Sequence, residues 1–462
     1  MTLIKSISGI RGTIGGTVGD NLTPIDTVKF AAAYGTWIKA QRSKEHYRVV
    51  VGRDARISGA MVQNLVMNTL IGMGIDVIDL DLSTTPTVEI AVPLEHADGG
   101  IILTASHNPK QWNALKLLDQ NGEFLNAEHS QRVLDIATAD SMEFADVDDL
   151  GAITVNQAYF DIHIDEVLDL ELVNVKAIAD SNFKVVVDAV NSTGGIAIPL
   201  LLERLGVEAV KIHCEPNGQF PHNPEPLKQH LTDLSEKVVS SHADFGIAVD
   251  PDVDRLAFMD EKGMMFGEEY TLVACADYIL SQKPGNTVSN LSSTRALRDV
   301  TEKHGGTYTA SAVGEVNVVN AMKATQAVIG GEGNGGIIYP ESHFGRDALV
   351  GVALFLSLLA ERKMAVSALR ASYPSYFMSK KKIDLNPSID VDAILVAMEA
   401  KYANEQISTI DGVKIDFPTE WVHLRKSNTE AIIRIYTEAP SQSAADQLAD
   451  KIISEIKAIA GI

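Results

Sequence analysis

The chain has 462 residues, 45% of them hydrophobic and 22% charged, which predicts a globular protein of roughly three domains. Lys and Arg number 39 and Asp and Glu number 61, so the net charge is −22. An acidic surface argues against binding to nucleic acid or to anionic membranes, although a local basic pocket can still hold a phosphorylated substrate. The two cysteines exclude a disulfide framework and an all-cysteine metal site.

No apolar leader is found in residues 1–16, and the longest apolar stretch, 350–360, is too short to cross a bilayer. We therefore expect a cytoplasmic protein, with a buried helix at 350–360. Apolar runs alternate with helical patterns through most of the chain, which indicates an α/β fold whose sheets are covered on both faces. Strands are predicted at 48–52, 77–82, 99–104, 184–190, 207–212, 245–249, 287–291, 327–330, 413–417 and 431–436, and helices at 61–74, before 205, at 295–305 and at 444–460.

The α/β rhythm restarts several times, and polar or Gly/Pro-rich breaks separate the rounds. These breaks predict four domains, over residues 1–150, 151–255, 256–367 and 368–462.

The segment 104–109, Thr-Ala-Ser-His-Asn-Pro, follows an apolar strand, and ligands of open α/β sheets bind at such carboxyl ends. Ser106 is a candidate nucleophile. Because adjacent side chains of an extended chain point apart, Ser106 and His107 are not expected to pair by themselves. The alternative is a polar turn that ends at Pro109.

A second polar segment, Asp250-Pro-Asp252-Val-Asp254-Arg255, also follows an apolar strand. Carboxylates at alternate positions of an extended chain face one way, and their repulsion raises their pKa values unless a cation lies among them. Oxygen ligands favour a hard ion such as Mg²⁺. An EF-hand loop, with Glu261 in twelfth place, is disfavoured because Arg255 stands where that loop needs glycine. A solvated acidic turn is the remaining alternative.

The Gly-rich segment 331–336 matches the dinucleotide fingerprint G-x-G-x-x-G, which requires a helix to begin at its last glycine. The next residues, 337–340, look extended and end in proline. We therefore interpret this segment as a loop that presents Glu332 and Asn334 to a polar ligand, with a flexible turn as the alternative.

The segment 425–430, Arg-Lys-Ser-Asn-Thr-Glu, precedes a strand that carries Arg434, and its side chains and backbone N–H groups suit a phosphate. The alternative is a hairpin turn with a basic edge. Arginines beside glycines at 8–13 and 52–59, among them Arg11, Arg53 and Arg56, are further phosphate candidates, with surface arginines on loops as the alternative. No G-x-x-x-x-G-K-[ST] motif is present, which argues against a P-loop nucleotide site.

Together these segments resemble the α-D-phosphohexomutase family, which comprises phosphoglucomutases, phosphomannomutases and phosphoglucosamine mutases. The resemblance implies three similar mixed α/β sandwich domains and a smaller C-terminal α/β domain around a central cleft. Its motifs occur in order at 8–13, 104–116, 250–255, 331–335 and 425–429.

The resemblance also implies residue roles. Ser106 matches the serine that carries the phosphoryl group, and its oxygen joins Asp250, Asp252 and Asp254 around Mg²⁺. Lys116, Arg11, His107 and Arg255 match residues at the reacting centre, and the first three are candidates for the general base. Glu332 and Asn334 match the sugar-reading loop, and Arg425, Ser427, Asn428 and Thr429, with Arg434 beside them, match the loop for the substrate's second phosphate.

The implied reaction moves a phosphoryl group from Ser106 to a hexose phosphate, through a hexose 1,6-bisphosphate that turns over and returns its other phosphate. Many family members have Ser-Gly-His after the loop glutamate, whereas this chain has Asn334-Gly335-Gly336, with His343 nearby. This form is similar to the archaeal-type phosphoglucosamine mutase branch. We therefore expect glucosamine 6-phosphate and 1-phosphate as substrates, with glucose or mannose phosphates as the alternative.

Two other classes compete with this hypothesis. An NAD-dependent oxidoreductase predicts a helix at Gly336, and an extended chain there would exclude it. A non-catalytic sugar-phosphate-binding homologue predicts an incomplete set of metal ligands, whereas all three aspartates are present. The expected partner is a small sugar phosphate, with no nucleic acid and no membrane.

Overall fold

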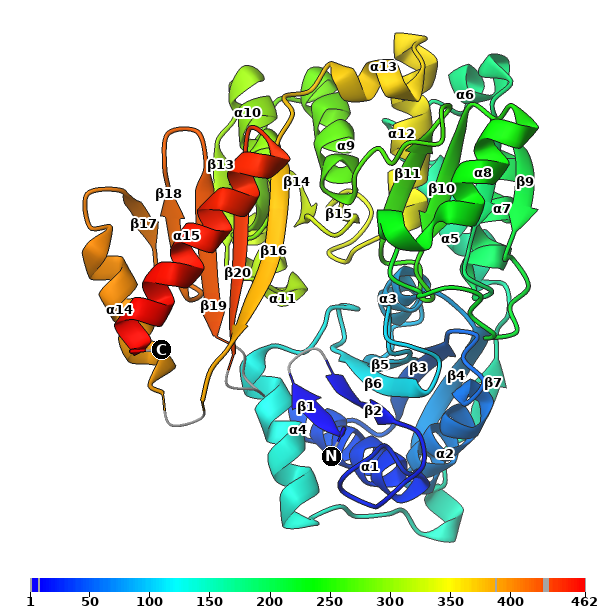
Figure 1. Cartoon of the computed structure of the whole chain (residues 1–462). Helices are drawn as coiled ribbons and strands as arrows, with labels where there is room; N and C mark the ends of the chain where they lie inside the picture. The colour runs from blue at the N-terminus through cyan, green and yellow to red at the C-terminus, as the bar shows by residue number, and fades with distance from the viewer. Residues whose placement is uncertain (1, 7–8, 387–388, 427–431, 462) are drawn as a thin grey trace. The chain divides into compact units, whose positions relative to one another are not determined.

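The computed structural model describes residues 2–6, 9–386, 389–426 and 432–461 (Figure 1). The chain divides into two compact units. The first unit comprises residues 1–279 and 334–368, and the second comprises residues 280–333 and 369–462.

The first unit begins with a seven-stranded mixed sheet of order β1-β2-β6-β5-β3-β4-β7. β3, β4, β5 and β7 run parallel, and β1, β2 and β6 add antiparallel pairs. A capping box fixes the start of α1. The Thr23 side chain accepts a hydrogen bond from the backbone N–H of Asp26, and the Asp26 carboxylate accepts one from the backbone N–H of Thr23. The elements are β1 (Ile4–Ser6), β2 (Gly9–Thr13), α1 (Pro24–Gln41), β3 (Tyr47–Arg53), α2 (Gly59–Gly72), β4 (Ile75–Leu82), α3 (Thr85–Leu94), β5 (Gly99–Leu103), β6 (Trp112–Leu118), α4 (Ala127–Ala139) and β7 (Ile153–Val155).

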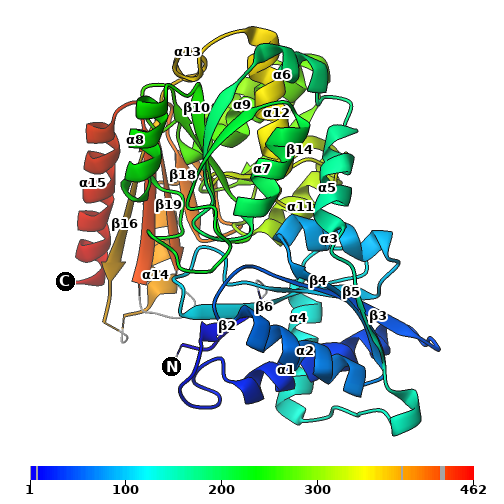
Figure 2. The ribbon, with the colours of Figure 1, turned by 90° about the vertical axis from the view of Figure 1, so that its right-hand side faces the viewer.

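A second sheet of the first unit has the order β11-β10-β8-β9, with β10, β8 and β9 parallel and β11 antiparallel. Figure 2 shows helices of the first unit around these strands. The remaining elements of the first unit, of which β15 is not a strand of this sheet, are α5 (Tyr159–Leu168), α6 (Val175–Ser181), β8 (Lys184–Asp188), α7 (Gly194–Arg204), β9 (Glu208–Ile212), α8 (Thr232–Ser241), β10 (Phe245–Val249), β11 (Leu256–Asp260), α9 (Glu268–Gln282), β15 (Gly336–Ile338) and α12 (Ala348–Arg362).

Helix α12 is buried along almost its entire length, because every residue from Ala348 to Ala360 is covered. Asp347 starts the helix by accepting hydrogen bonds from the backbone of Leu349 and Val350. The apolar run at 350–360 therefore forms the buried helix that the sequence predicts.

The second unit contains the parallel strands β12, β13 and β14, in the order β13-β12-β14, and a five-stranded antiparallel sheet of order β16-β20-β19-β18-β17. Helix α15 lies along this second sheet beside α14 (Figure 1). The elements are β12 (Asn286–Asn290), α10 (Ala296–Lys303), β13 (Tyr308–Ser311), α11 (Glu315–Thr325), β14 (Ala327–Glu332), α13 (Val366–Ala371), β16 (Phe377–Asp384), α14 (Val391–Lys401), β17 (Gln406–Ser408), β18 (Val413–Asp416), β19 (Trp421–Lys426), β20 (Ile432–Ala439) and α15 (Gln442–Ala460).

The predicted α/β class, with mixed sheets and helices, is confirmed. The chain is extended at 336–338, where the oxidoreductase hypothesis requires a helix, so the dinucleotide reading is wrong. Strand β11 begins directly after Arg255, which excludes the EF-hand alternative as well. Among the described residues, no helix is both long and apolar enough to span a membrane.

Candidate active site

The serine loop, residues 104–109, follows β5 at the carboxyl end of the parallel strands. Ser106 has a positive φ of 47°, an uncommon conformation for a residue with a side chain. Its backbone N–H donates to Thr104 Oγ1 at 3.0 Å, and the Thr104 hydroxyl donates to Asp54 Oδ2 at 2.7 Å. These bonds hold the Ser106 hydroxyl at a fixed position.

The expectation that Ser106 and His107 point apart is wrong. Ser106 Oγ lies 3.3 Å from His107 Nδ1. The expectation assumed an extended chain, whereas the left-handed conformation of Ser106 turns both side chains to the same side.

Arg56, which the sequence suggested as a phosphate ligand, instead donates hydrogen bonds to the backbone of the serine loop. It is 1% exposed and forms an ion pair with Asp54 at 2.9 Å. Its guanidinium donates to the carbonyl oxygens of Pro109 at 2.8 Å and Asn108 at 2.7 Å, and also to that of Ser106. Arg53 is occupied too, because it pairs with Asp81 at 2.7 Å. Both arginines therefore have structural partners.

The aspartate loop, residues 250–255, joins β10 to β11. Asp250, Asp252 and Asp254 are each 0% exposed, and one carboxylate oxygen of each lies within 4.8 Å of the others. The segment is a turn rather than the extended chain that the alternation argument assumed, and Val253 has a φ of 64°. The carboxylates converge because the turn folds them inward.

The two loops meet at the serine hydroxyl. Ser106 Oγ donates to Asp250 Oδ2 at 2.9 Å. Lys116, on β6, places its ammonium 2.7 Å from Asp252 Oδ2 and 3.2 Å from Asp254 Oδ2. A hydroxyl, three carboxylates and an ammonium thus share one buried volume within the first unit.

The surrounding charges shift the pKa values of Asp250 and Asp254 in opposite directions. Burial, and then the charges of Asp252 and Asp254, hold the pKa of Asp250 well above its usual range. Burial also acts to raise the pKa of Asp254, but Arg346, Lys116 and Arg255 outweigh it and hold that pKa low. Burial alone would lower the pKa of Lys116, yet Asp252 and Asp254 hold it above its ordinary value.

Two oxygens of the cluster lack donors in the described part of the chain. Asp252 Oδ1 and Asp254 Oδ1 are buried and accept no hydrogen bond there. Buried carboxylate oxygens without donors are costly, and a hard divalent cation would satisfy them. This donor set therefore fits the metal that the sequence suggests.

Arginines supply further positive charge around the serine. Arg346 donates to Asp254 Oδ2 at 2.8 Å, and Arg255 pairs with Glu225 at 3.3 Å. Burial lowers the pKa of His107 to about 2, with Arg255 as the next cause and smaller contributions from Arg346 and Arg11. The imidazole next to Ser106 is therefore neutral.

Sequence reasoning missed two residues of this cluster. Arg346 precedes α12, and Thr85, at the start of α3, donates to Asp252 Oδ2 at 2.6 Å. Neither lies in a recognised motif, although Thr85 follows the end of the predicted strand at 77–82 by three residues. The other sequence signal is that each stands close to the start of a predicted or apparent helix.

The residues predicted to contact the sugar belong to different units. Glu332 belongs to the second unit, is 6% exposed, and accepts from Asn290 Nδ2 at 2.9 Å. Asn334 belongs to the first unit and accepts from the backbone of Gly336 at 3.2 Å. Gly335 has a φ of 88°, and a Cβ there would lie 2.2 Å from the carbonyl oxygen of Leu256, so this position requires glycine.

His343, which lies near the loop in sequence, contacts two carboxylates. Its Nε2 lies 3.2 Å from Asp347 Oδ2, and its Nδ1 lies 3.4 Å from Glu89 Oε2. The histidine is therefore part of the network that holds the start of α12.

The basic loop is described only at its two flanks. Arg425, on β19, pairs with Asp411 at 2.9 Å, and Arg434 is exposed on β20. The remaining residues predicted for phosphate binding, Ser427, Asn428 and Thr429, lie outside the described residues.

A serine beside a buried acidic triad and several cations defines a phosphoryl-transfer centre. Four family models match the chain in order. They are the phosphoglucomutase/phosphomannomutase α/β/α domains I, II and III, over residues 3–143, 161–263 and 267–376, and the C-terminal domain, over residues 381–455.

Relatives of the same length support this assignment. The chain is 34% identical to a phosphoglucomutase/phosphomannomutase of Thermococcus kodakarensis, over 94% of this chain and 95% of the relative. It is 31% identical to a probable phosphoglucosamine mutase of Methanopyrus kandleri, over 97% of both chains. It is 30% identical to a phosphoglucosamine/phosphogalactosamine mutase of Sulfurisphaera tokodaii, over 96% of this chain and 97% of the relative.

A crystal structure of a phosphoglucomutase/phosphomannomutase family protein from Burkholderia thailandensis superposes with a TM-score of 0.84 at 26% identity, over 98% of both chains. The chain therefore belongs to the phosphoglucomutase/phosphomannomutase family, and it is an intramolecular phosphotransferase of the phosphohexomutase type. The predicted family and enzyme class are confirmed.

Proposed function

We propose that this enzyme interconverts hexose 6-phosphates and hexose 1-phosphates through a phosphoserine at Ser106 and a bound hexose 1,6-bisphosphate. The carrying observation is the bond of 2.9 Å from Ser106 Oγ to Asp250 Oδ2, beside two buried carboxylate oxygens that lack donors in the described chain. In each half-reaction the bond between phosphorus and one oxygen breaks, and a bond to the other oxygen forms. In the first half-reaction the sugar hydroxyl gives up a proton and the Ser106 oxygen takes one, and in the second half-reaction Ser106 gives up the proton and the sugar oxygen takes one.

Asp250, Asp252 and Asp254, with an oxygen of the phosphorylated Ser106, are the residues that would hold Mg²⁺. When bound, the ion would neutralise charge on the phosphoryl oxygens. This proposal rests on the convergence of the three carboxylates within 4.8 Å and on their complete burial.

The cations around the loop supply the rest of the electrostatic stabilisation. Phosphoryl transfer spreads negative charge over the equatorial oxygens, so fixed positive groups favour the transition state. Lys116, kept protonated by its two carboxylates, suits this role, and Arg255 and Arg11 add guanidinium groups. Among the proposed bases, His107 lies 3.3 Å from Ser106 Oγ, but its pKa of about 2 makes the imidazole a weak proton acceptor, so its position supports this role and its basicity does not.

The second unit is proposed to grip the substrate's other phosphate. The strand register places Lys382 opposite Arg434, and Arg434 opposite Arg425. Directly opposed residues share one face of a sheet, where like charges repel, and Asp411 and Asp384 offset Arg425 and Lys382 at 2.9 and 3.2 Å. This row of cations supports the predicted phosphate loop at Ser427, Asn428 and Thr429.

Phosphorylation of Ser106 is tested by intact-mass spectrometry of the protein as purified and after incubation with glucose 1,6-bisphosphate. We expect a mass gain of one phosphoryl group that is absent from Ser106→Ala, which also loses activity. Ser130→Ala, on α4, is the matched control and keeps both. Phosphate on Ser106→Ala, or activity without Ser106, would contradict the proposal.

For the sugar, we propose glucosamine 6-phosphate and 1-phosphate, with glucose and mannose phosphates as the alternative. Support comes from the Glu332-Gly-Asn334-Gly-Gly loop and from the names of several archaeal relatives. One relative is instead named for glucose and mannose phosphates. The test is kcat/KM measured side by side for glucosamine, glucose, mannose and N-acetylglucosamine phosphates. A higher kcat/KM for any sugar other than glucosamine would overturn this choice.

The remaining expectations stay proposals. These are the domain boundaries near 150, 255 and 367, a cytoplasmic location, and small sugar phosphates as the partners.

A further inference from the structure

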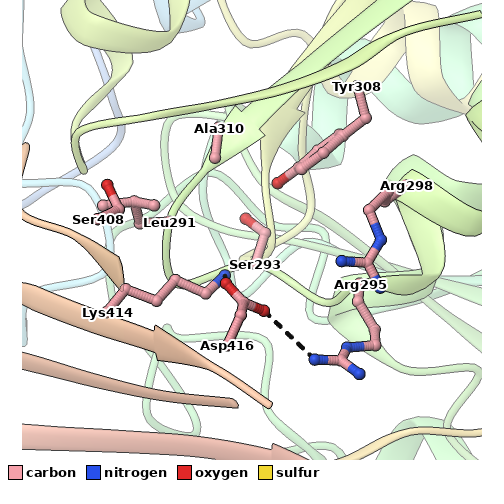
Figure 3. Close-up of a pocket in the computed structure, with 9 residues that line it drawn as sticks. All are labelled: Leu291, Ser293, Arg295, Arg298, Tyr308, Ala310, Ser408, Lys414 and Asp416. Carbon is pink, nitrogen blue, oxygen red and sulfur yellow. Dashed lines mark hydrogen bonds and ion pairs between the residues drawn. The ribbon is translucent and has the colours of Figure 1, made fainter. Parts of the chain in front are cut away.

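A pocket of about 150 Å³ lies within the second unit, at the junction of its two sheets (Figure 3). One wall comes from β13 and the start of α10, and the other comes from β17 and β18. The lining residues are Leu291, Ser293, Arg295, Arg298, Tyr308, Ala310, Ser408, Lys414 and Asp416.

Lys414 is the feature that points to a ligand. It is 6% exposed, and its ammonium lies 3.9 Å from Asp416 Oδ2, beyond hydrogen-bond distance. Its other contact is the ring of Trp421, with the centroid 4.4 Å away. In the described part of the chain the ammonium donates no hydrogen bond, and it lines the pocket, so it can donate to a ligand there. Burial lowers the pKa of Lys414, and Asp416 and Glu438 oppose this only in part.

Other groups that line the pocket can also donate. Figure 3 shows the Tyr308 hydroxyl and the Arg298 guanidinium on the wall opposite Lys414. The hydroxyl of Ser408 lies on the same wall as Lys414. The one lining carboxylate, Asp416, is engaged by Arg295 at 3.3 Å. Beyond the lining, Glu438 lies 3.8 Å from Arg295 and Asp299 lies 3.7 Å from Arg298. Among the described residues, Lys414 has no carboxylate within hydrogen-bond distance, so the lining favours an anion at its ammonium.

The size of the pocket restricts the anion. Sites for drug-sized ligands have volumes of about 300–1,000 Å³, whereas a water molecule takes about 30 Å³ of liquid volume. A pocket of 150 Å³ holds a group the size of phosphate and excludes a nucleotide. We propose that it binds a small tetrahedral oxyanion of the phosphate type, held by Lys414, Arg298 and Tyr308.

This site is distinct from the row of cations at Arg425 and Arg434, but a short path connects it to the sugar loop. Ser293 lines the pocket, and its Oγ accepts from the backbone N–H of Gly333 at 3.0 Å. Gly333 follows Glu332, the proposed sugar-reading residue. Occupancy therefore stiffens the support of Glu332, and we expect it to change KM for the sugar phosphate more than kcat. This consequence rests on the proposed function, whereas the binding itself does not.

Binding is tested by equilibrium dialysis with radiolabelled inorganic phosphate. We expect wild type to bind at two sites, one lost in Lys414→Met and the other in Arg425→Ala. Lys457→Met removes the same charge from the exposed face of α15 and keeps both sites. If Lys414→Met retains the full stoichiometry, the proposal is overturned. Glucosamine 6-phosphate serves as the second probe and competes only at the site that Arg425 holds.

Thermal unfolding separates ligand binding from a structural role of Lys414. Because Met removes a desolvated charge and keeps the volume, the variant's Tm without phosphate should equal or exceed that of wild type. The rise in Tm that phosphate produces should become smaller. A lower Tm with an unchanged phosphate effect would show that Lys414 is structural and contradict the proposal.

Activity gives the last readout. We expect low phosphate concentrations to change KM of wild type and of Lys457→Met by about twofold to tenfold, and to leave KM of Lys414→Met unchanged. An identical phosphate response in Lys414→Met would contradict the coupling. Failure of the proposed mutase activity in all variants would leave the dialysis result as an independent test.

Discussion

Two lysines of this enzyme are buried to nearly the same extent, and their surroundings act on them in opposite directions. Lys116 is 8% exposed and Lys414 is 6% exposed. Lys116 lies between two carboxylates, at 2.7 and 3.2 Å, which hold its pKa high. Lys414 faces one carboxylate at 3.9 Å and an aromatic ring, and its pKa is lowered.

The difference teaches that burial alone does not decide the state of a charged group. Around Lys116, three aspartates converge beside Arg346 and Arg255, and two of the carboxylate oxygens still lack donors in the described chain. Around Lys414, the ammonium lines a pocket and has no carboxylate of the described residues within hydrogen-bond distance. The first site therefore fits a cation, and the second fits an anion.

The largest contrast is expected from the two Lys→Met variants. Lys116→Met leaves Asp252 and Asp254 with less counter-charge, and removal of one partner of a buried pair costs about 3 kcal/mol or more. We also expect kcat/KM to fall about 10²–10³-fold, because the variant loses a preorganised cation. Urea unfolding without divalent ions and steady-state kinetics check both effects. If Lys414→Met loses as much unfolding free energy as Lys116→Met, the contrast between the two lysines is wrong.

Asp252→Asn should affect activity much more than stability. The amide keeps the shape of the side chain, while Lys116 retains Asp254 at 3.2 Å. We expect kcat to fall about 10²-fold or more, since one proposed ligand is lost, and the unfolding midpoint to change little. In addition, Mg²⁺ should raise the Tm of wild type and not that of the variant. An unchanged rate with Mg²⁺ would contradict the metal assignment.

The strands and the chemical motifs could be predicted from sequence because they are local. Continuous apolar runs gave β10 and β5 to within a residue, and the serine and aspartate motifs stand directly after them. The convergence of the two motifs was implied by the family resemblance, and the extended geometry assumed for each motif was wrong. Positive φ angles at Ser106 and Val253 aim the side chains, and no sequence pattern marks them.

What the sequence could not provide were contacts made across long stretches of chain. Arg346, Thr85 and Arg56 reach the loops from elements far away in sequence. Lys414 sits in an ordinary alternating strand, β18, whose pattern gives no sign of a pocket. Its burial depends on β13 and α10, which lie about a hundred residues earlier and pack there only in the folded chain.

The smallest expected effect is a difference in how stability depends on pH. The folded pKa of Lys414 lies below the ordinary value of 10.5, so the unfolded chain binds more protons between these two values, and stability rises with pH across that window. Lys116 behaves oppositely: its stabilising contribution is present below 10.5 and is lost only as pH rises through its higher folded pKa.

Lys414→Met should therefore flatten the rise in stability on approaching pH 10, relative to wild type and to Lys457→Met. Urea unfolding at several pH values without phosphate measures this difference, and other titrating groups cancel in the comparison. Adding phosphate supplies the missing negative charge and should reduce the wild-type slope toward that of the variant. A steeper slope with phosphate would mean that the anion binds away from this ammonium.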